Sequence, residues 1–294
     1  MRATPRSRKP PRLVERYCQA RYGFLCTCDT IKGWGRVTDT ASFEIRLAET
    51  ACDLEASQRL RYRVFVEELG GGGATVDHSA RIERDSLDEV CDHLVLIDPA
   101  RASGDHVVGA YRLLRSDQAA RAGRFYCDSE YDLGPLRRSN RKLLELGRSC
   151  VHPDYRGGAA MLLMWNALGD YVLAHDIEIL FGVASFHGTD AAALAQPLAW
   201  LHHHHLAPEA LRARALREAF QPMDLMAEDA LDRRAAMAAM PNLIKAYLRL
   251  GGFVGEGAFI DHAFNTTDVL LLMDTKAMSA RHRAFYTRRF EERA

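Results

Sequence analysis

The feature that most constrains the fold is an apolar, strand-like run that leads into a basic glycine turn. The run is LELGRSCVHPDYRGG, residues 144–158. Its first part has the apolar content of a buried strand, and Pro153 ends that strand because proline cannot donate to a sheet ladder. A helical pattern follows at 158–175. A strand joined to a helix by a short turn is typical of a layered α/β fold, in which the helix packs back on the sheet.

The rest of the chain alternates between strand-like and helix-like segments. This order predicts an α/β sandwich with a central mixed sheet and a helical insertion at about 190–240, where Ala, Leu and Arg are frequent. The expected domain covers 42–294. The other expected strands cover 42–48, 93–98, 106–114, 143–151, 177–185, 252–260 and 268–274, and the other expected helices cover 50–69, 241–250 and 277–291.

Residues 1–41 differ in composition from this domain. Nine Lys or Arg residues face three acidic residues there, and Pro5, Pro10 and Pro11 oppose an early helix. We interpret the segment as a basic N-terminal extension that is disordered or loosely docked. The alternative is an arm that contacts acidic lipid headgroups or an acidic partner.

Composition narrows the class of protein. Lys plus Arg and Asp plus Glu each total 39, so the chain is not a dedicated nucleic-acid binder. No apolar run approaches the roughly 18 to 20 residues that span a bilayer, and no signal-peptide core follows the basic start. The seven cysteines are scattered, as expected for reduced thiols. We therefore expect a cytoplasmic protein, with peripheral contact at the inner face of the membrane as the alternative for its basic start.

Two charges interrupt the apolar strand at 143–151. Strict alternation puts Glu145 and Gly147 on one face and Arg148 on the other, unless a bulge intervenes. A buried ion pair is one interpretation, and a reaction site at a splayed strand end is the other. In the second, Glu145 is a general base, while Arg148 or nearby backbone N–H groups stabilise developing negative charge.

The turn after this strand predicts a phosphate cradle. Arg156, Gly157 and Gly158 open the following helix, whose N-terminus offers free N–H groups to the phosphates of a phosphopantetheine. If the donor is an acidic carrier protein, as the resemblance given below implies, we expect it to dock on the basic residues that precede the strand: Arg137, Arg138, Arg141 and Lys142.

Further candidate residues stand elsewhere. His187 and Asp190, in FHGTD, follow a buried strand and are expected to line an amino-acid pocket. Tyr247 is expected to pack within its helix, with proton donation to a leaving thiolate as the alternative. The run His202 to His205 predicts no metal site, because consecutive helical residues point in different directions.

The chain resembles a known family through long, ordered motifs. RYRVFVEELG (61–70), ERDSLD (83–88), GAYRLL (109–114) and LELGRSCVHPDYR (144–156) resemble the acyl-homoserine-lactone synthases. They match more closely the related L-ornithine Nα-acyltransferases of the GNAT superfamily. LFGVASFHGTD (180–190), LHHHHLAPEALR (201–212), MPNLIKAYLRLGGFVGEGAFID (240–261) and FNTTDV (264–269) resemble the ornithine enzymes alone. The resemblance covers about 43–290.

The resemblance implies an activity and a set of site residues. The activity is transfer of a (3R)-hydroxyacyl group from acyl carrier protein to the α-amine of L-ornithine, giving lyso-ornithine lipid. Acyl-phosphopantetheine on the carrier is then the co-substrate, with no bound cofactor and no metal. By the same resemblance, Glu145 and Arg148 form the catalytic pair, and the residues expected to bind substrate are Arg63, Phe65, Asp85, Asp88 and Arg112.

Three observations weigh the alternatives. Ala159, Ala160 and Met161 stand where acetyltransferases continue their glycine loop, which favours a carrier-protein donor over acetyl-CoA. An acyl-homoserine-lactone synthase would lack the long 190–262 segment, although another N-acyl amino acid synthase stays open. A non-catalytic acyl-binding module has no need of the Glu145 and Arg148 pair.

Overall fold

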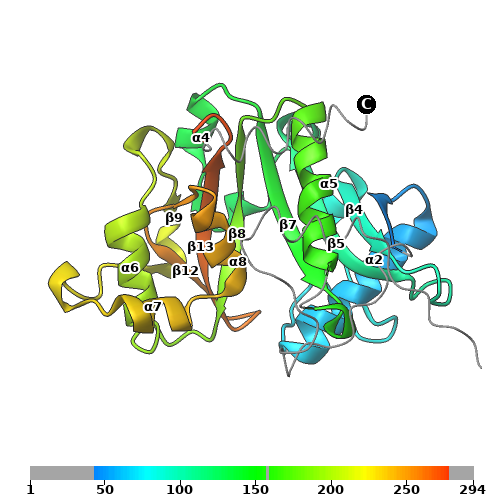
Figure 1. The fold of residues 1–294 in the computed structure, drawn as a ribbon, viewed down its shortest axis with the longest axis horizontal. Helices are drawn as coiled ribbons and strands as arrows, with labels where there is room; N and C mark the ends of the chain where they lie inside the picture. The colour runs from blue at the N-terminus through cyan, green and yellow to red at the C-terminus, as the bar shows by residue number, and fades with distance from the viewer. Residues whose placement is uncertain (1–42, 157–158, 278–294) are drawn as a thin grey trace, which may run out of the picture. The chain divides into compact units, whose positions relative to one another are not determined.

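The computed structural model describes residues 43–156 and 159–277. Its main feature is a nine-stranded sheet with the order β1-β4-β5-β7-β8-β13-β12-β10, in which β11 also pairs with β13 (Figure 1). The pairs are antiparallel except for β7 and β8, which run parallel. This confirms the predicted α/β sandwich with a mixed central sheet. The predicted extension at 1–41, Gly157, Gly158 and the predicted helix beyond residue 277 lie outside the described residues.

The elements fall close to the predicted ranges. The strands of the central sheet are β1 (Glu44–Leu47), β4 (Asp92–Ile97), β5 (Val107–Arg115), β7 (Leu143–Val151), β8 (Ile179–His187), β10 (Phe220–Gln221), β11 (Phe253–Val254), β12 (Ala258–Asp261) and β13 (Thr266–Asp274). Two small ladders pair β2 (Val76–Asp77) with β3 (Ile82–Glu83) and β6 (Tyr131–Asp132) with β9 (Arg214–Ala215). The helices are α2 (Ala51–Arg61), α3 (Ser116–Ala122), α4 (Gly134–Arg138), α5 (Ala160–Ala174), α6 (Ala195–His205), α7 (Arg233–Ala239) and α8 (Asn242–Arg249).

Helices cover the sheet on both faces. On one face, Met164 and Leu168 of α5 pack with Leu144 of β7 and Leu180 of β8, in a cluster that α6 and α8 extend. On the other face, Leu60 of α2 packs against β4 and β5. Strands buried on both faces need apolar residues at consecutive positions, which is why LVLI and VLLLM lack a polar alternation.

The helix predicted at 50–69 changes type halfway. It starts at Thr50, whose side chain and that of Asp53 form a capping box. The α-helix then ends at Arg61 and continues as a π-helix over Tyr62–Glu68. π-Helical turns are rare and occur frequently at functional sites. Here the wider turn leaves Arg61 fully buried while Phe65 reaches the cavity described below.

Strands β7 and β8 pair only where they begin. Their parallel ladder joins 143–145 to 179–181. Beyond it, β7 stays on β5 and β8 stays on β13, so the two strands spread apart (Figure 1). Gly182 sits at the last point of close approach, because a Cβ there would lie 2.1 Å from the Leu146 carbonyl oxygen.

The prediction of helices throughout 190–240 is wrong in its middle part. Helices α6 and α7 are present, but 206–232 forms turns and the short strands β9 and β10. Strand β10 extends the central sheet by pairing with β12. Pro208 and Pro222 restrict helix formation, and tertiary pairing overrides the helical propensity of the Ala, Leu and Arg residues.

Within residues 43–156 and 159–277, none of the helices is both long and apolar enough to cross a bilayer.

Replacing Gly182 by Ala should destabilise the fold where β7 and β8 separate. The added methyl meets a backbone oxygen that cannot rotate away, so we expect a loss of about 1–3 kcal/mol in the free energy of unfolding. Urea denaturation measures this loss. Gly72→Ala is the matched control, because the nearest atom to its Cβ is 3.9 Å away. Equal stability of the two variants would show that the strands do not meet closely at Gly182.

Candidate active site

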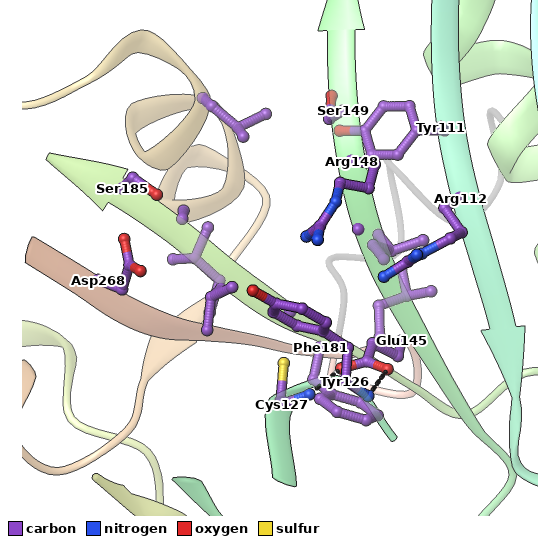
Figure 2. Close-up of a pocket in the computed structure, with 18 of the residues that line it drawn as sticks. Tyr111, Arg112, Tyr126, Cys127, Glu145, Arg148, Ser149, Phe181, Ser185 and Asp268 are labelled. Carbon is purple, nitrogen blue, oxygen red and sulfur yellow. Dashed lines mark hydrogen bonds between the residues drawn. The ribbon is translucent and has the colours of Figure 1, made fainter. Parts of the chain in front are cut away.

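A cavity of about 260 Å³ lies between the separated ends of β7 and β8. Strands β5, β7, β8 and β13 and the turn at Tyr126 and Cys127 form its walls. Apolar side chains make up most of the lining, and a few charged groups project into it (Figure 2). Small-molecule sites typically combine an apolar wall with a few polar groups that fix the orientation of the ligand.

A β-bulge in β7 shapes one side of the cavity. Ala110 pairs with Cys150 and Arg112 with Gly147, so Tyr111 faces two residues, Arg148 and Ser149. Arg148 has a φ of 50°, a left-handed conformation that is uncommon outside glycine. The bulge breaks the strict alternation that would separate Glu145 from Arg148. As a result, both residues line the same cavity.

Three arginines and three carboxylates form a buried network behind this wall. Arg61 donates to Glu83 over 2.5 Å and to Asp88 over 2.8 Å. The other four contacts are Arg112 to Asp85 at 2.7 Å, Arg112 to Asp88 at 2.9 Å, Arg148 to Glu83 at 3.1 Å and Arg148 to Asp85 at 3.3 Å.

The network sets the charge of its members. Burial acts to raise the pKa of Asp88, but the Arg61 and Arg112 guanidiniums hold that pKa well below its usual range. Asp85 and Asp88 lie behind the cavity lining, and their direct contact with substrate stays a prediction. They hold Arg112 and Arg148, which do line it.

Glu145 lies on the floor of the cavity, with both carboxylate oxygens engaged. The Tyr126 N–H donates to one over 2.7 Å and the Cys127 N–H donates to the other over 2.6 Å (Figure 2). The side chain is only 3% exposed, and this burial raises the pKa of Glu145 while the hydrogen bonds from Cys127 and Tyr126 oppose the rise. Glu145 therefore anchors the 126–127 turn, and its service as a general base stays a prediction.

The anchored turn carries an aromatic ring to the arginines. The Arg148 guanidinium lies 4.5 Å from the centre of the Tyr126 ring, and that of Arg112 lies 5.6 Å from it. Cation–π contacts of this kind are worth about 2 kcal/mol when the groups are desolvated. The position of Arg148 thus depends on Glu145 through Tyr126.

The other predicted substrate residues divide between the cavity and the surface. Phe65 lines the cavity. Arg63 does not line it: its Nη1 lies 2.5 Å from His152 Nε2 and forms an ion pair with Asp105. His187 and Asp190 lie at and just beyond the end of β8 and are exposed, so the structure does not place them in the lining of the predicted pocket.

Two predicted residues concern the donor and the leaving group. Arg156 donates to Glu68 over 2.7 Å, close to the start of α5. Tyr247 lines the cavity from α8, and its ring centre lies 5.1 Å from that of Trp165. Tyr247 thus packs against α5 and also faces the cavity, and proton donation to the leaving thiolate stays a prediction.

Sequence reasoning missed several polar residues near the cavity, among them Asp268, Glu130 and Tyr126. Asp268 projects into it from β13, opposite Arg148 (Figure 2). A carboxylate oxygen of Glu130 lies within 4.8 Å of one of Asp268. A carboxylate that precedes the apolar run VLLLM within strand TTDVLLLMD is a signal like the one that identified Glu145, so Asp268 could have been found. Tyr126 and Glu130 lie in an irregular segment whose sequence carries no comparable signal.

Known proteins resemble this chain over most of its length. Residues 60–166 match the family described as an acetyltransferase (GNAT) domain. The L-ornithine N(alpha)-acyltransferase of Rhodobacter capsulatus is 73% identical over 254 residues, which cover 86% of this chain and 97% of that protein. The protein of the same name from Brucella abortus is 43% identical over 249 residues, covering 83% and 89%. The solved structure of FeeM, an N-acyl amino acid synthase from uncultured soil microbes, aligns with a TM-score of 0.46 and 11% identity, covering 80% of this chain and 92% of that one.

Replacing Glu145 by Gln should reduce both stability and turnover. An amide offers one acceptor oxygen to two backbone N–H groups and turns a donor toward one of them, which leaves a buried donor unpaired. We expect a loss of about 1–3 kcal/mol in the free energy of unfolding. Urea denaturation and steady-state kinetics of the same preparation measure the two effects. A fall in turnover with unchanged stability would instead assign Glu145 to proton transfer alone.

Proposed function

The chain belongs to the family of L-ornithine N(alpha)-acyltransferases, and we propose that it transfers a (3R)-hydroxyacyl group from acyl carrier protein to the α-amine of L-ornithine. The product is lyso-ornithine lipid, the first intermediate of ornithine-lipid synthesis. The observation that carries this proposal is the 73% identity to the Rhodobacter capsulatus enzyme, over almost the whole of that protein.

The reaction needs a free amine and a stabilised oxyanion. The amine lone pair attacks the thioester carbonyl, a C–N bond forms, the C–S bond breaks, and the amine loses a proton while the phosphopantetheine thiolate leaves. Arg148 and an N–H freed at the bulge are suited to stabilise the oxyanion, because a bulge leaves one residue out of the ladder. Glu145 is our candidate for the proton acceptor. In that role, a bound substrate displaces one of the two backbone N–H groups that donate hydrogen bonds to the Glu145 carboxylate.

The donor is proposed to enter at the N-terminus of α5. This 15-residue helix starts at Ala160, directly after Arg156 and the predicted cradle glycines, and helix N-termini favour phosphate groups. A carrier protein is favoured over acetyl-CoA by Ala159, Ala160 and Met161, which replace the further glycines of acetyltransferases. We place the protein in the cytoplasm, with 1–41 as the segment for contact with acidic lipids.

The basic residues before β7 do not adjoin this entrance, which corrects their predicted role. They precede the first residue of β7, whereas α5 follows its last, and nine strand residues span about 30 Å. Figure 1 shows α4 at one end of the sheet and the tip of the β7 arrow at the other. Arg141 is moreover held by Asp274 through two hydrogen bonds of 2.5 and 2.6 Å.

The purified protein should acylate L-ornithine at the α-nitrogen with 3-hydroxyacyl carrier protein as donor. Mass spectrometry with fragmentation of the product identifies the acylated nitrogen, and release of free carrier thiol gives the rate. A parallel reaction uses acetyl-CoA as the donor in place of the acyl carrier protein. Equal rates with acetyl-CoA and no product from the carrier protein would refute the proposal.

Arg156→Ala should weaken the use of the carrier protein more than that of ornithine. We expect the KM for the carrier to rise about fivefold, which corresponds to about 1 kcal/mol of lost charge attraction at a partly exposed position. Higher salt should raise the same KM in the unmodified enzyme. The double variant Arg137→Ala, Arg138→Ala is the control, because α4 lies at the far end of β7. A raised KM in the control alone would move the docking surface to that end.

A further inference from the structure

Three carboxylates meet at the cavity wall that faces Arg112 and Arg148. Glu130 follows the turn anchored by Glu145, Asp261 ends β12, and Asp268 lies in β13. One oxygen from each lies within 4.8 Å of the others. Asp261 and Asp268 line the cavity, and Glu130 is adjacent to them. We call these three residues the acidic trio.

The acidic trio lacks the compensation that the other buried carboxylates have. Glu130 and Asp268 are each only 4% exposed. Among the described residues, Glu130 Oε2 and Asp268 Oδ1 have no hydrogen-bond partner, and no ion pair joins any member of the trio to a basic side chain. Glu83 and Asp88, by contrast, are each bonded to arginines at 2.5 to 3.1 Å.

Burial of unpaired acids is costly unless a proton or a cation joins them. Burial and the neighbouring Asp261 carboxylate raise the pKa of Asp268 to about 6, although the Ser185 and Thr266 hydroxyls beside it act in the opposite direction. Burial and the carboxylates of Asp268 and Asp261 raise the pKa of Glu130 well above its usual range. The trio therefore gains stability from a cation that reaches it through the cavity.

The opposite wall has the complementary charge. Arg112 Nη2 is buried and has no hydrogen-bond partner among the described residues, so it can donate a hydrogen bond to a bound anion. In Figure 2, Arg112 and Arg148 point into the cavity from one side, and Asp268 and Ser185 stand on the other. A molecule with a carboxylate at one end and an ammonium at the other matches both walls.

We propose that Glu130, Asp261 and Asp268 bind the side-chain ammonium of the acceptor, so that the cavity selects an L-α,ω-diamino acid whose carboxylate faces Arg112 and Arg148. This inference rests on the proposed function, since it assigns the acceptor's orientation in that reaction. It adds three residues that determine which amino acid, and which of its nitrogens, is acylated.

The orientation decides which nitrogen reacts. An ammonium among carboxylates keeps its proton, because opposite charges stabilise the charged form. It then has no lone pair and cannot attack a thioester. The α-amine lies nearer to two guanidiniums, where like charge favours loss of its proton. The charge pattern of the cavity thus protects one amine and activates the other.

The decisive comparison uses L-ornithine and L-norvaline, which share a carbon skeleton but differ in the side-chain amine. Asp268→Asn and Glu130→Gln should each lower kcat/KM for ornithine on the order of 10²-fold, as expected when a buried charge pair loses one partner. The kcat/KM for norvaline should stay the same or rise. Asp224→Asn, an exposed carboxylate away from the cavity, is the control and should leave both values unchanged. A loss of folded protein lowers both substrates equally, so the ratio isolates recognition, and an unchanged ratio overturns the proposal.

A binding measurement separates this inference from the proposed reaction. Without any acyl donor, ornithine should raise the melting temperature of the wild type more than norvaline does, and the two buried variants should lose that difference. Ornithine-selective binding in a protein that acylates nothing would retain the trio's role while refuting the reaction.

Two further arms make the test complete. Asp261→Asn supplies the same ratio of kcat/KM for ornithine to kcat/KM for norvaline if the buried variants fold poorly. This half-buried side chain can keep its hydrogen bonds from the Ala263 and Phe264 N–H groups.

Magnesium and calcium chloride are titrated in the same melting assay. Metal binding that depends on Asp268 and is not displaced by ornithine would make the trio a metal site and overturn the proposal.

Discussion

A neutral network of buried charges fixes the geometry of the site. Arg61, Arg112 and Arg148 share Glu83, Asp85 and Asp88, and these six residues come from α2, β5, β7 and the segment at 82–88. An isolated buried charge is costly, but three positive and three negative groups in direct contact compensate one another. Each member contacts two opposite charges, so removing one leaves the buried network with an uncompensated net charge. The network therefore holds the four segments in position together.

The network also explains how β7 tolerates its bulge. The left-handed backbone of Arg148 is unfavourable by itself, and such conformations persist where the surroundings determine them fully. Two carboxylates and the Tyr126 ring hold the Arg148 side chain. The same contacts therefore maintain the break in the ladder that opens the strand toward a substrate. One interpretation of the sequence, a buried ion pair between Glu145 and Arg148, is wrong. Arg148 pairs with Glu83 and Asp85, and Glu145 accepts hydrogen bonds from two backbone N–H groups.

Features set by neighbouring residues in the sequence could be predicted, whereas features set by contacts between distant segments could not. Strands β7 and β8 and helix α5 have strong local patterns, and their predicted bounds agree with the structure to within two residues. Glu145 and Arg148 stand out because charges are costly in an apolar strand. The bulge depends on how β7 pairs with β5. The π-helix depends on tertiary contacts of Arg61, at the end of α2, and of Phe65, within the π-helix. Neither can be predicted from local sequence. The same holds for β10, whose pairing with β12 replaces the predicted helix.

Glu145 connects the two charged ends of the cavity. Its carboxylate fixes the N–H groups of Tyr126 and Cys127, and Tyr126 contacts Arg148 at the cationic end. Glu130 follows three residues after Cys127, where its own N–H donates to the Cys127 carbonyl, and it belongs to the acidic end. A short, hydrogen-bonded turn rather than a flexible loop therefore sets the separation of the two ends. In the proposed binding mode, a fixed separation discriminates between acceptors by the number of methylene groups between their charges. One carboxylate in β7 thus holds the turn that adjoins both ends of the cavity.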